Sequence, residues 1–127
     1  MNKVTLTGRL TADPDVRRNE ENGKVVAMYT LAVRRPFAKE GQPEVDYVRC
    51  VCFNARANWV SKCASRGTKI EVTGSLRTSS YTGKDGKTCY KTEVLVAEQE
   101  FAESKRRGIY EEYERLRAMI EGEDVGE

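Results

Sequence analysis

The sequence predicts an all-β fold, a closed or nearly closed five-stranded β-barrel with one short helix between its third and fourth strands. Two observations lead to this fold class. Apolar and polar residues alternate through most of the first hundred positions, as is typical of half-buried strands. The alternation gives way once, between residues 55 and 66, to apolar residues at helical spacing. Five strands joined by short turns would leave exposed edges in an open sheet, and closing the sheet removes those edges.

Three strands precede the helix. In the first of them, Val4, Leu6 and Leu10 share one face and polar residues occupy the other. Turn-forming residues follow at 13–15 (Asp-Pro-Asp) and at 22–23 (Asn-Gly). The expected strands cover residues 3–10, 24–34 and 47–53, with a polar loop over residues 35–46.

The helix and two further strands complete the barrel. Trp59, Val60 and Cys63 fall on one helical face, and Gly67 stands where a helix C-cap is expected, so we expect a helix over residues 55–66. Gly74 interrupts the next strand and predicts a bend or bulge. The last two strands are expected over residues 69–77 and 88–97, joined by a hairpin turn at residues 83–86. A helix between the third and fourth strands of such a barrel is the arrangement of the OB (oligonucleotide-binding) fold.

The chain divides near residue 101. The predicted barrel domain, residues 1–101, is rich in basic residues, whereas acidic residues are concentrated towards the end, and the net charge of the whole chain is only +2. Residues 102–127 are charged and helix-prone, and they end in an acidic stretch. Their apolar stripe consists of Ile109, Tyr113, Leu116 and Ile120. Because an isolated helix of this length is marginal in water, we expect the stripe to dock on the barrel or on a neighbouring subunit in preference to a separate partner.

The sequence shows no leader-peptide pattern and no apolar run near the ~20 residues that a membrane helix needs. We therefore expect a cytoplasmic protein with reduced thiols. Cys50 and Cys52 are separated by one residue, unlike the pairs of zinc knuckles, and both point into the predicted interior. The chain has no histidine and no glycine-rich phosphate loop. We expect no metal, no cofactor and no enzymatic activity.

The third strand separates its side chains by parity. The inward residues Val48, Cys50 and Cys52 are small and apolar, as a barrel interior requires. The opposite face consists of Tyr47, Arg49, Val51 and Phe53. Exposed rings beside an arginine are typical of single-strand binding, in which bases stack on the rings and basic residues contact phosphates. Parity alone leaves two explanations open: base stacking, or packing of the rings beneath a loop or against a second subunit.

Two more rings lie beside basic residues. Phe37 follows Arg34 and Arg35 in a polar loop, where it either caps the barrel or makes a contact. Tyr81 is either a solvated hairpin tyrosine or a stacking ring, and its neighbours Arg77, Lys84 and Lys87 favour stacking. Trp59 and Tyr29 lie on inward faces and are expected in the core, whereas Tyr90 stays unassigned.

Several blocks of this sequence occur in the order and spacing of a known family. They cover residues 2–17, 30–33, 47–54, 66–67, 72–78 and 92–94. Together they resemble the bacterial single-stranded DNA-binding protein family over about residues 1–101. The resemblance implies an OB fold that wraps single-stranded DNA without sequence preference during replication, recombination and repair, at the nucleoid.

The resemblance also implies roles for individual residues. It places the family's stacking positions at Phe37, Tyr47, Phe53 and Tyr81. It matches Lys3, Arg49 and Arg77 to basic positions that face DNA, and the phosphate-contacting set that we expect adds the basic residues Arg9, Arg34, Arg35, Lys84 and Lys87. A homotetramer is implied. Because Val48 stands where many relatives have a histidine tied to subunit contacts, a dimer is the alternative.

The C-terminal segment departs from the family pattern. Relatives usually carry a long flexible linker that ends in an acidic tip closed by Pro-Phe, which recruits replication and repair proteins. This sequence has instead a helix-like segment and an acidic end without Pro-Phe. The resemblance therefore leaves open whether replication and repair proteins are partners of this chain.

Two alternative functions stay open. A primosomal relative uses the same fold as a replication-restart adaptor, and the retention of all four rings argues against it. An RNA-binding OB module is the second alternative, because stacking hardly separates DNA from RNA, whereas reading the 2′-hydroxyl does.

Overall fold

The computed structural model describes residues 1–103 and Arg117. Its elements are β1 (Val4–Leu10), β2 (Asp15–Arg18), β3 (Val25–Arg34), β4 (Val45–Phe53), α1 (Ala55–Cys63), β5 (Lys69–Thr82) and β6 (Thr88–Phe101). The predicted all-β fold with one helix before its last two strands is confirmed. The expected stripe of Ile109, Tyr113, Leu116 and Ile120 lies outside the described residues.

Hydrogen bonds close five of the strands into a ring. The order is β1-β5-β6-β4-β3, and β3 pairs again with β1 through Arg9↔Ala32 and Leu10↔Leu31. One of the neighbour pairs is parallel, β4 with β6, and it is short. The other neighbours in the ring are antiparallel. The ring thus provides the strand closure that the sequence predicts.

The four-residue strand β2 was not predicted. It lies outside the ring and extends the sheet beyond β3, where Val16 pairs with Ala27 and Arg17 with Val26. The Asp-Pro-Asp sequence at 13–15 indicates a turn, and the turn is followed at once by a strand that contains a single apolar residue. With so little alternation, only the backbone pairing to β3 identifies β2.

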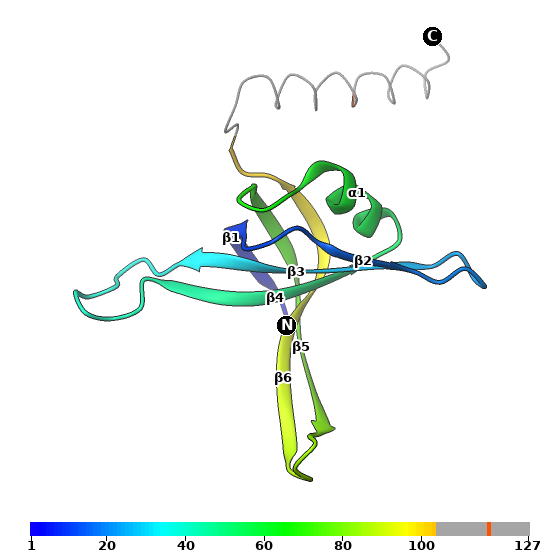
Figure 1. Ribbon diagram of the computed structural model, residues 1–127. Coiled ribbons are helices and arrows are strands. Elements are labelled where there is room, and N and C mark those ends of the chain that lie inside the picture. The colour runs from blue at the N-terminus through cyan, green and yellow to red at the C-terminus, as the bar shows by residue number, and fades with distance from the viewer. Residues whose placement is uncertain (104–116, 118–127) are drawn as a thin grey trace.

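Two other boundaries differ from those expected. Helix α1 ends at Cys63 instead of Arg66, because Ala64 is already extended (φ −122°, ψ 142°). Gly67, expected as the C-cap, lies in the following turn with φ +88°, and its N–H donates to the Leu10 carbonyl. Strands β5 and β6 are longer than expected because their hairpin continues beyond the ring as a free two-stranded arm (Figure 1). In that arm both faces meet solvent, so hydrophobic alternation no longer marks the strands.

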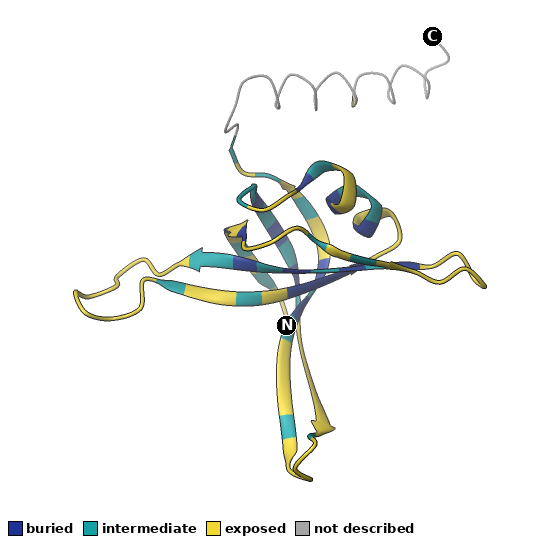
Figure 2. Cartoon of the chain, viewed as in Figure 1, coloured by how far each residue is buried: buried dark blue, intermediate teal, exposed yellow. Residues whose placement is uncertain are grey.

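The core fills the ring and is covered at one end by α1 (Figure 2). Its largest fully buried side chains come from every strand of the ring and from the helix: Leu10, Leu31, Ile70, Val60, Val72, Val94, Cys50 and Cys52. Tyr29 is buried as expected, and its hydroxyl donates to Gln99 Oε1 at 2.8 Å. Gln99 Nε2 donates in turn to the Arg56 carbonyl, which ties α1 to β6. Trp59 is only partly buried and packs on Phe101, with ring centroids 5.2 Å apart.

Gly74 lies within the ring, close to the base of the β5–β6 arm. The register of β5 on β6 shifts between Thr73 and Gly74, which confirms the predicted bulge. A Cβ at Gly74 would lie 2.0 Å from the Leu95 carbonyl oxygen, so only glycine permits this approach. In the described part of the chain, no helix is long and apolar enough to cross a membrane.

Candidate nucleic-acid interface

The outer face of β4 presents the predicted rings to solvent. Directly opposite residues of an antiparallel pair share a face, and the register pairs Tyr47 with Ala32, Arg49 with Thr30 and Phe53 with Val26. Tyr47 is 71% exposed and Phe53 is 45% exposed, and Arg49 is exposed between them. Their partners on β3 have short side chains, which leave the rings uncovered. The described chain therefore offers no loop that buries these rings.

Val51 shares this outer face and is nevertheless buried, with 7% exposure. It lies in the middle of the sheet, flanked by Met28 of β3 and by Leu95 of β6. The parallel pair Val51↔Leu95 makes the outer face of β4 continuous with the outer face of β6. The two groups of predicted site residues, one on β3–β4 and one on the β5–β6 arm, therefore belong to one surface.

The loop between β3 and β4 carries the third ring. Phe37 is 91% exposed, so it does not cap the ring of strands. Arg34 pairs with Val45 at the end of β3 and shares the face of Tyr47 and Arg49.

Arg35 is engaged on the other side of this hairpin. Its Nε and Nη2 donate to the two carboxylate oxygens of Asp46, at 3.1 and 2.7 Å. The bond from Arg35 holds the pKa of Asp46 below its usual range, and the same bond raises the pKa of Arg35. Asp46 pairs with Val33, so by parity it belongs to the face opposite Tyr47. Arg35 thus fastens the base of the 35–44 loop.

The β5–β6 arm carries the fourth ring. Tyr81 is 56% exposed and shares the outer face with Arg77, four residues earlier on β5. Lys84 and Lys87 lie in the turn at the tip of the arm and are exposed. The Asn2 side chain binds the Leu76 backbone twice, as donor at 2.7 Å and as acceptor at 2.8 Å. These bonds hold Lys3 beside the base of the arm.

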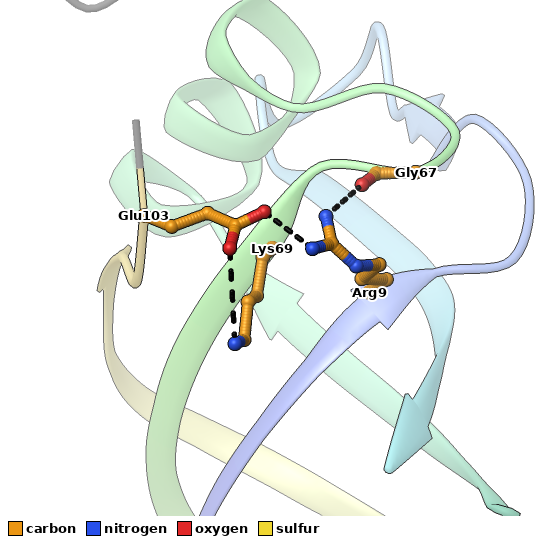
Figure 3. A network of polar contacts seen from close by, with 4 residues as sticks. All are labelled: Arg9, Gly67, Lys69 and Glu103. Carbon is orange, nitrogen blue, oxygen red and sulfur yellow. Dashed lines mark hydrogen bonds and ion pairs between the residues drawn. The ribbon is translucent and has the colours of Figure 1, made fainter. Parts of the chain in front are cut away.

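Arg9 shares the outer face with Tyr47, because both pair with Ala32, but its side chain is already engaged. Its guanidinium donates to the Gly67 carbonyl at 3.1 Å and pairs with the Glu103 carboxylate (Figure 3). Lys69 lies 3.8 Å from the second oxygen of the same carboxylate. The side chain that the sequence analysis assigns to phosphate contact is therefore held, in this structure, at the junction where the described chain leaves β6.

The comparisons with known proteins agree with this arrangement. The model of the single-strand binding protein family matches residues 1–102. The chain belongs to this family. Among its relatives is the single-stranded DNA-binding protein of Bacillus cereus, 44% identical over 109 residues, which cover 85% of this chain and 64% of the relative. The single-stranded DNA-binding protein 3 of Listeria innocua is 41% identical over 109 residues, 85% of this chain and 68% of the relative.

A third relative, the single-stranded DNA-binding protein 3 of Clostridium acetobutylicum, is 43% identical over 103 residues, 81% of this chain and 72% of the relative. The match to this chain spans less than two thirds of the Bacillus cereus protein and of a similar protein from Bacillus anthracis, which is matched over 63% of its length.

The cysteines of this family member are placed as the parity of β4 predicts. Cys50 and Cys52 are buried and unpaired. Burial raises the pKa of the Cys50 thiol to about 12 and that of the Cys52 thiol to about 11. Neutral thiols in a closed core are poor metal ligands and poor nucleophiles. Among residues 1–103 and Arg117, no group of three potential metal ligands occurs.

Basic residues on the outer face that the sequence does not single out include Arg17 of β2 and Lys91 of β6. Arg17 of β2 is exposed and shares the face of Val26 and Phe53. The sequence shows only a basic residue two positions after Asp15. Until residues 15–18 are recognised as a strand, that spacing does not show on which face Arg17 lies. Arg17 was therefore missed because β2 was missed.

Proposed function

We propose that this chain binds single-stranded DNA without sequence preference, by stacking bases on its exposed rings and contacting phosphates with lysine and arginine. The observation that carries the proposal is the outer face of β4, where Tyr47 and Phe53 lie exposed with Arg49 between them. Phe37 and Tyr81 extend the same set to the neighbouring loop and arm. The names of its relatives support the same ligand.

Physical chemistry supports this ligand over a duplex. An exposed ring is in contact with water until another flat group covers it, and an unstacked base is such a group. Stacking of one base on an aromatic side chain contributes ~1–3 kcal/mol to binding. Duplex bases are already stacked and offer no free faces. Of the eight basic residues assigned to phosphates, six have side chains that make no ion pair or hydrogen bond with any described residue: Lys3, Arg34, Arg49, Arg77, Lys84 and Lys87.

The test is a titration of end-labelled oligo-dT by fluorescence anisotropy at several salt concentrations. The logarithm of the association constant should fall linearly with the logarithm of the salt concentration, with a slope of about −0.7 per phosphate contacted. Matched duplex DNA should compete poorly. Tight, salt-insensitive binding to the duplex contradicts the proposal, and matched RNA competing as well as DNA would favour the RNA-binding alternative.

We further propose that the chain assembles as a homotetramer, with a dimer as the alternative. Within the described residues, β1 pairs with β3 only at Arg9 and Leu10, so the edge from Val4 to Thr7 has a strand on one side alone. Such an edge is stabilised by pairing with another chain. Light scattering should give about four times the 14.4 kDa chain mass. A monomer at micromolar concentration contradicts this.

The remaining parts of the proposal follow from the ligand. A protein that coats single strands needs no catalytic group, and it acts in the cytoplasm at the nucleoid, where replication, recombination and repair expose such strands. We infer that residues 1–101 form the binding domain and that residues 102–127 form a separate segment.

A further inference from the structure

A cleft lies where the β2–β3 hairpin meets the end of β4. Its volume is about 690 Å³, within the roughly 300–1,000 Å³ typical of ligand pockets. Phe53 and Val26 form its apolar wall, and its basic lining comes from Arg17, Arg18 and Lys24. The β2–β3 turn and the 35–44 loop lie at opposite ends of β3 (Figure 1). Because Phe53 lines the cleft beside that turn, the cleft continues the row of exposed rings on β4.

The strand register places Arg17 on the same face as Phe53. Arg17 pairs with Val26, and Val26 pairs with Phe53, so the three residues form one row across three strands. Two strand spacings separate the Cα atoms of Arg17 and Phe53 by about 10 Å. An extended arginine side chain that lies over Val26 can therefore bring its guanidinium beside a group stacked on Phe53.

The neighbouring Arg18 is directed elsewhere. It pairs with the buried Val25, and its Nη2 donates to Asn58 Oδ1 of α1 at 3.1 Å. Arg17 has a weaker engagement, an exposed ion pair with Asp15 at 3.4 Å, which phosphate can displace at small cost. Lys24 makes no ion pair with a described residue.

The turn at the end of the hairpin is ordered by its own hydrogen bonds. Backbone bonds join Asn19 to Lys24 and Gly23 to Asn19, and the Asn22 side chain accepts the Lys24 N–H at 3.0 Å. Glu20 and Glu21 also line the cleft, at the tip of this turn. Their carboxylates repel phosphates, so an anionic strand is favoured on the Arg17 side of the cleft, next to Phe53.

We propose that this cleft binds one nucleotide of the same DNA strand, with its base on Phe53 and its phosphate held by Arg17 and Lys24. The inference rests on the proposed function and extends the path of the strand beyond β4 to β2. It assigns β2 a role in binding that the sequence pattern did not indicate.

The test measures the salt dependence of oligo-dT binding for Arg17→Gln and Lys24→Gln. The matched control is Lys62→Gln, which removes the same charge from the exposed surface of α1, off the outer face. Each cleft variant should reduce the magnitude of the log–log slope by about 0.7, the contribution of one phosphate contact. The control should keep the native slope. Arg17→Lys should restore most of the slope, because a charge in the same place is sufficient.

Three results would overturn the inference. Native slopes in both cleft variants, with native DNA binding intact, would refute the cleft and leave the proposed function standing. An equal loss in Lys62→Gln would show a general effect of net charge instead of a site. Failure of the native protein to bind oligo-dT would refute the proposed function and the cleft together. Thermal melting of each variant identifies a folding defect. If Arg17→Gln is found to be unfolded, the slope measured for Lys24→Gln, whose residue lies next to the turn, decides whether the cleft binds a phosphate.

Discussion

Two exposed tyrosines on one arm provide a matched test of the binding face. Tyr81 pairs with Cys89 and Tyr90 pairs with Ser80, so the two rings lie on opposite faces of the β5–β6 arm. Tyr81 is 56% exposed and Tyr90 is 80% exposed. If the strand follows the outer face, Tyr81→Ala should weaken binding and Tyr90→Ala should not.

The size of the effect follows from the stacking interaction. Loss of one stacked base costs ~1–3 kcal/mol, which corresponds to a roughly 5- to 150-fold increase in Kd at ~1.4 kcal/mol per tenfold change. Neither ring is part of the core, so both variants should keep their free energy of unfolding within about 0.5 kcal/mol.

The assay is anisotropy with labelled oligo-dT at one fixed salt concentration, with urea unfolding and light scattering of each variant. The two substitutions remove the same atoms from the same hairpin, so a general effect of lost tyrosine cancels between them. A loss of affinity in Tyr90→Ala equal to that in Tyr81→Ala, with assembly unchanged, would refute the assignment of the outer face.

Three further predictions concern stability. Trp59→Ala should lower the free energy of unfolding by about 2–3 kcal/mol, less than a fully buried ring costs, and leave DNA affinity unchanged. Gly74→Ala should cost about 1–3 kcal/mol or more, because its Cβ would overlap the Leu95 carbonyl oxygen. The free energy of unfolding should fall as pH rises from about 9 to about 11, because unfolding lets Cys50 and Cys52 ionise at their ordinary pKa near 9 while burial keeps them neutral in the fold.

Each of these has a direct check. Thermal melting and oligo-dT titration of Trp59→Ala separate a stability effect from a binding effect. A loss of DNA affinity with an unchanged melting temperature would contradict the assignment of Trp59 to the core.

Urea unfolding measures the stability of Gly74→Ala. A free energy of unfolding equal to that of the native protein would show that the backbone at the bulge can shift to accept a Cβ. For the thiols, urea midpoints at pH 8 and pH 10.5 are compared with those of a double alanine variant, whose pH slope should be shallower. An unchanged slope would contradict the prediction.

Hydrophobic alternation was sufficient to predict the ring and to divide β4 into two faces. Cys50 and Cys52 are buried and Tyr47 is exposed, as parity requires. Hydrophobic alternation marks strands that have one buried face. It therefore does not identify strand segments whose two faces are both exposed. It missed β2, whose only apolar residue is Val16, and it ended β5 near Arg77 although backbone pairing continues to Thr82.

The exposure of the rings assigned to the candidate site could be predicted from the sequence, whereas the contacts of its charged side chains could not. Parity along a strand places a ring inside or outside, whereas it does not show which carboxylate an exposed arginine will meet. Arg9 and Arg35 have the same sequence signature as Arg34, yet Arg9 pairs with Glu103 and Arg35 with Asp46. Those carboxylates are 94 and 11 residues away along the chain. Only the folded structure brings them into contact with the arginines, so the local sequence does not indicate these pairs.

The bulge at Gly74 lies inside the ring, close to the base of the β5–β6 arm. On the arm side of the bulge, Leu76 pairs with Val94, and Val94 is fully buried and pairs in turn with Cys50 of β4, so the ring continues to this pair. Beyond it, residues 77–82 extend about 20 Å at ~3.3 Å per residue. A rotation of about 10° where the arm leaves the ring would move the tip through about 3–4 Å on that length. The distance from Tyr81 to the rings on β4, and with it the spacing along a bound strand, therefore depends on the backbone at the base of the arm.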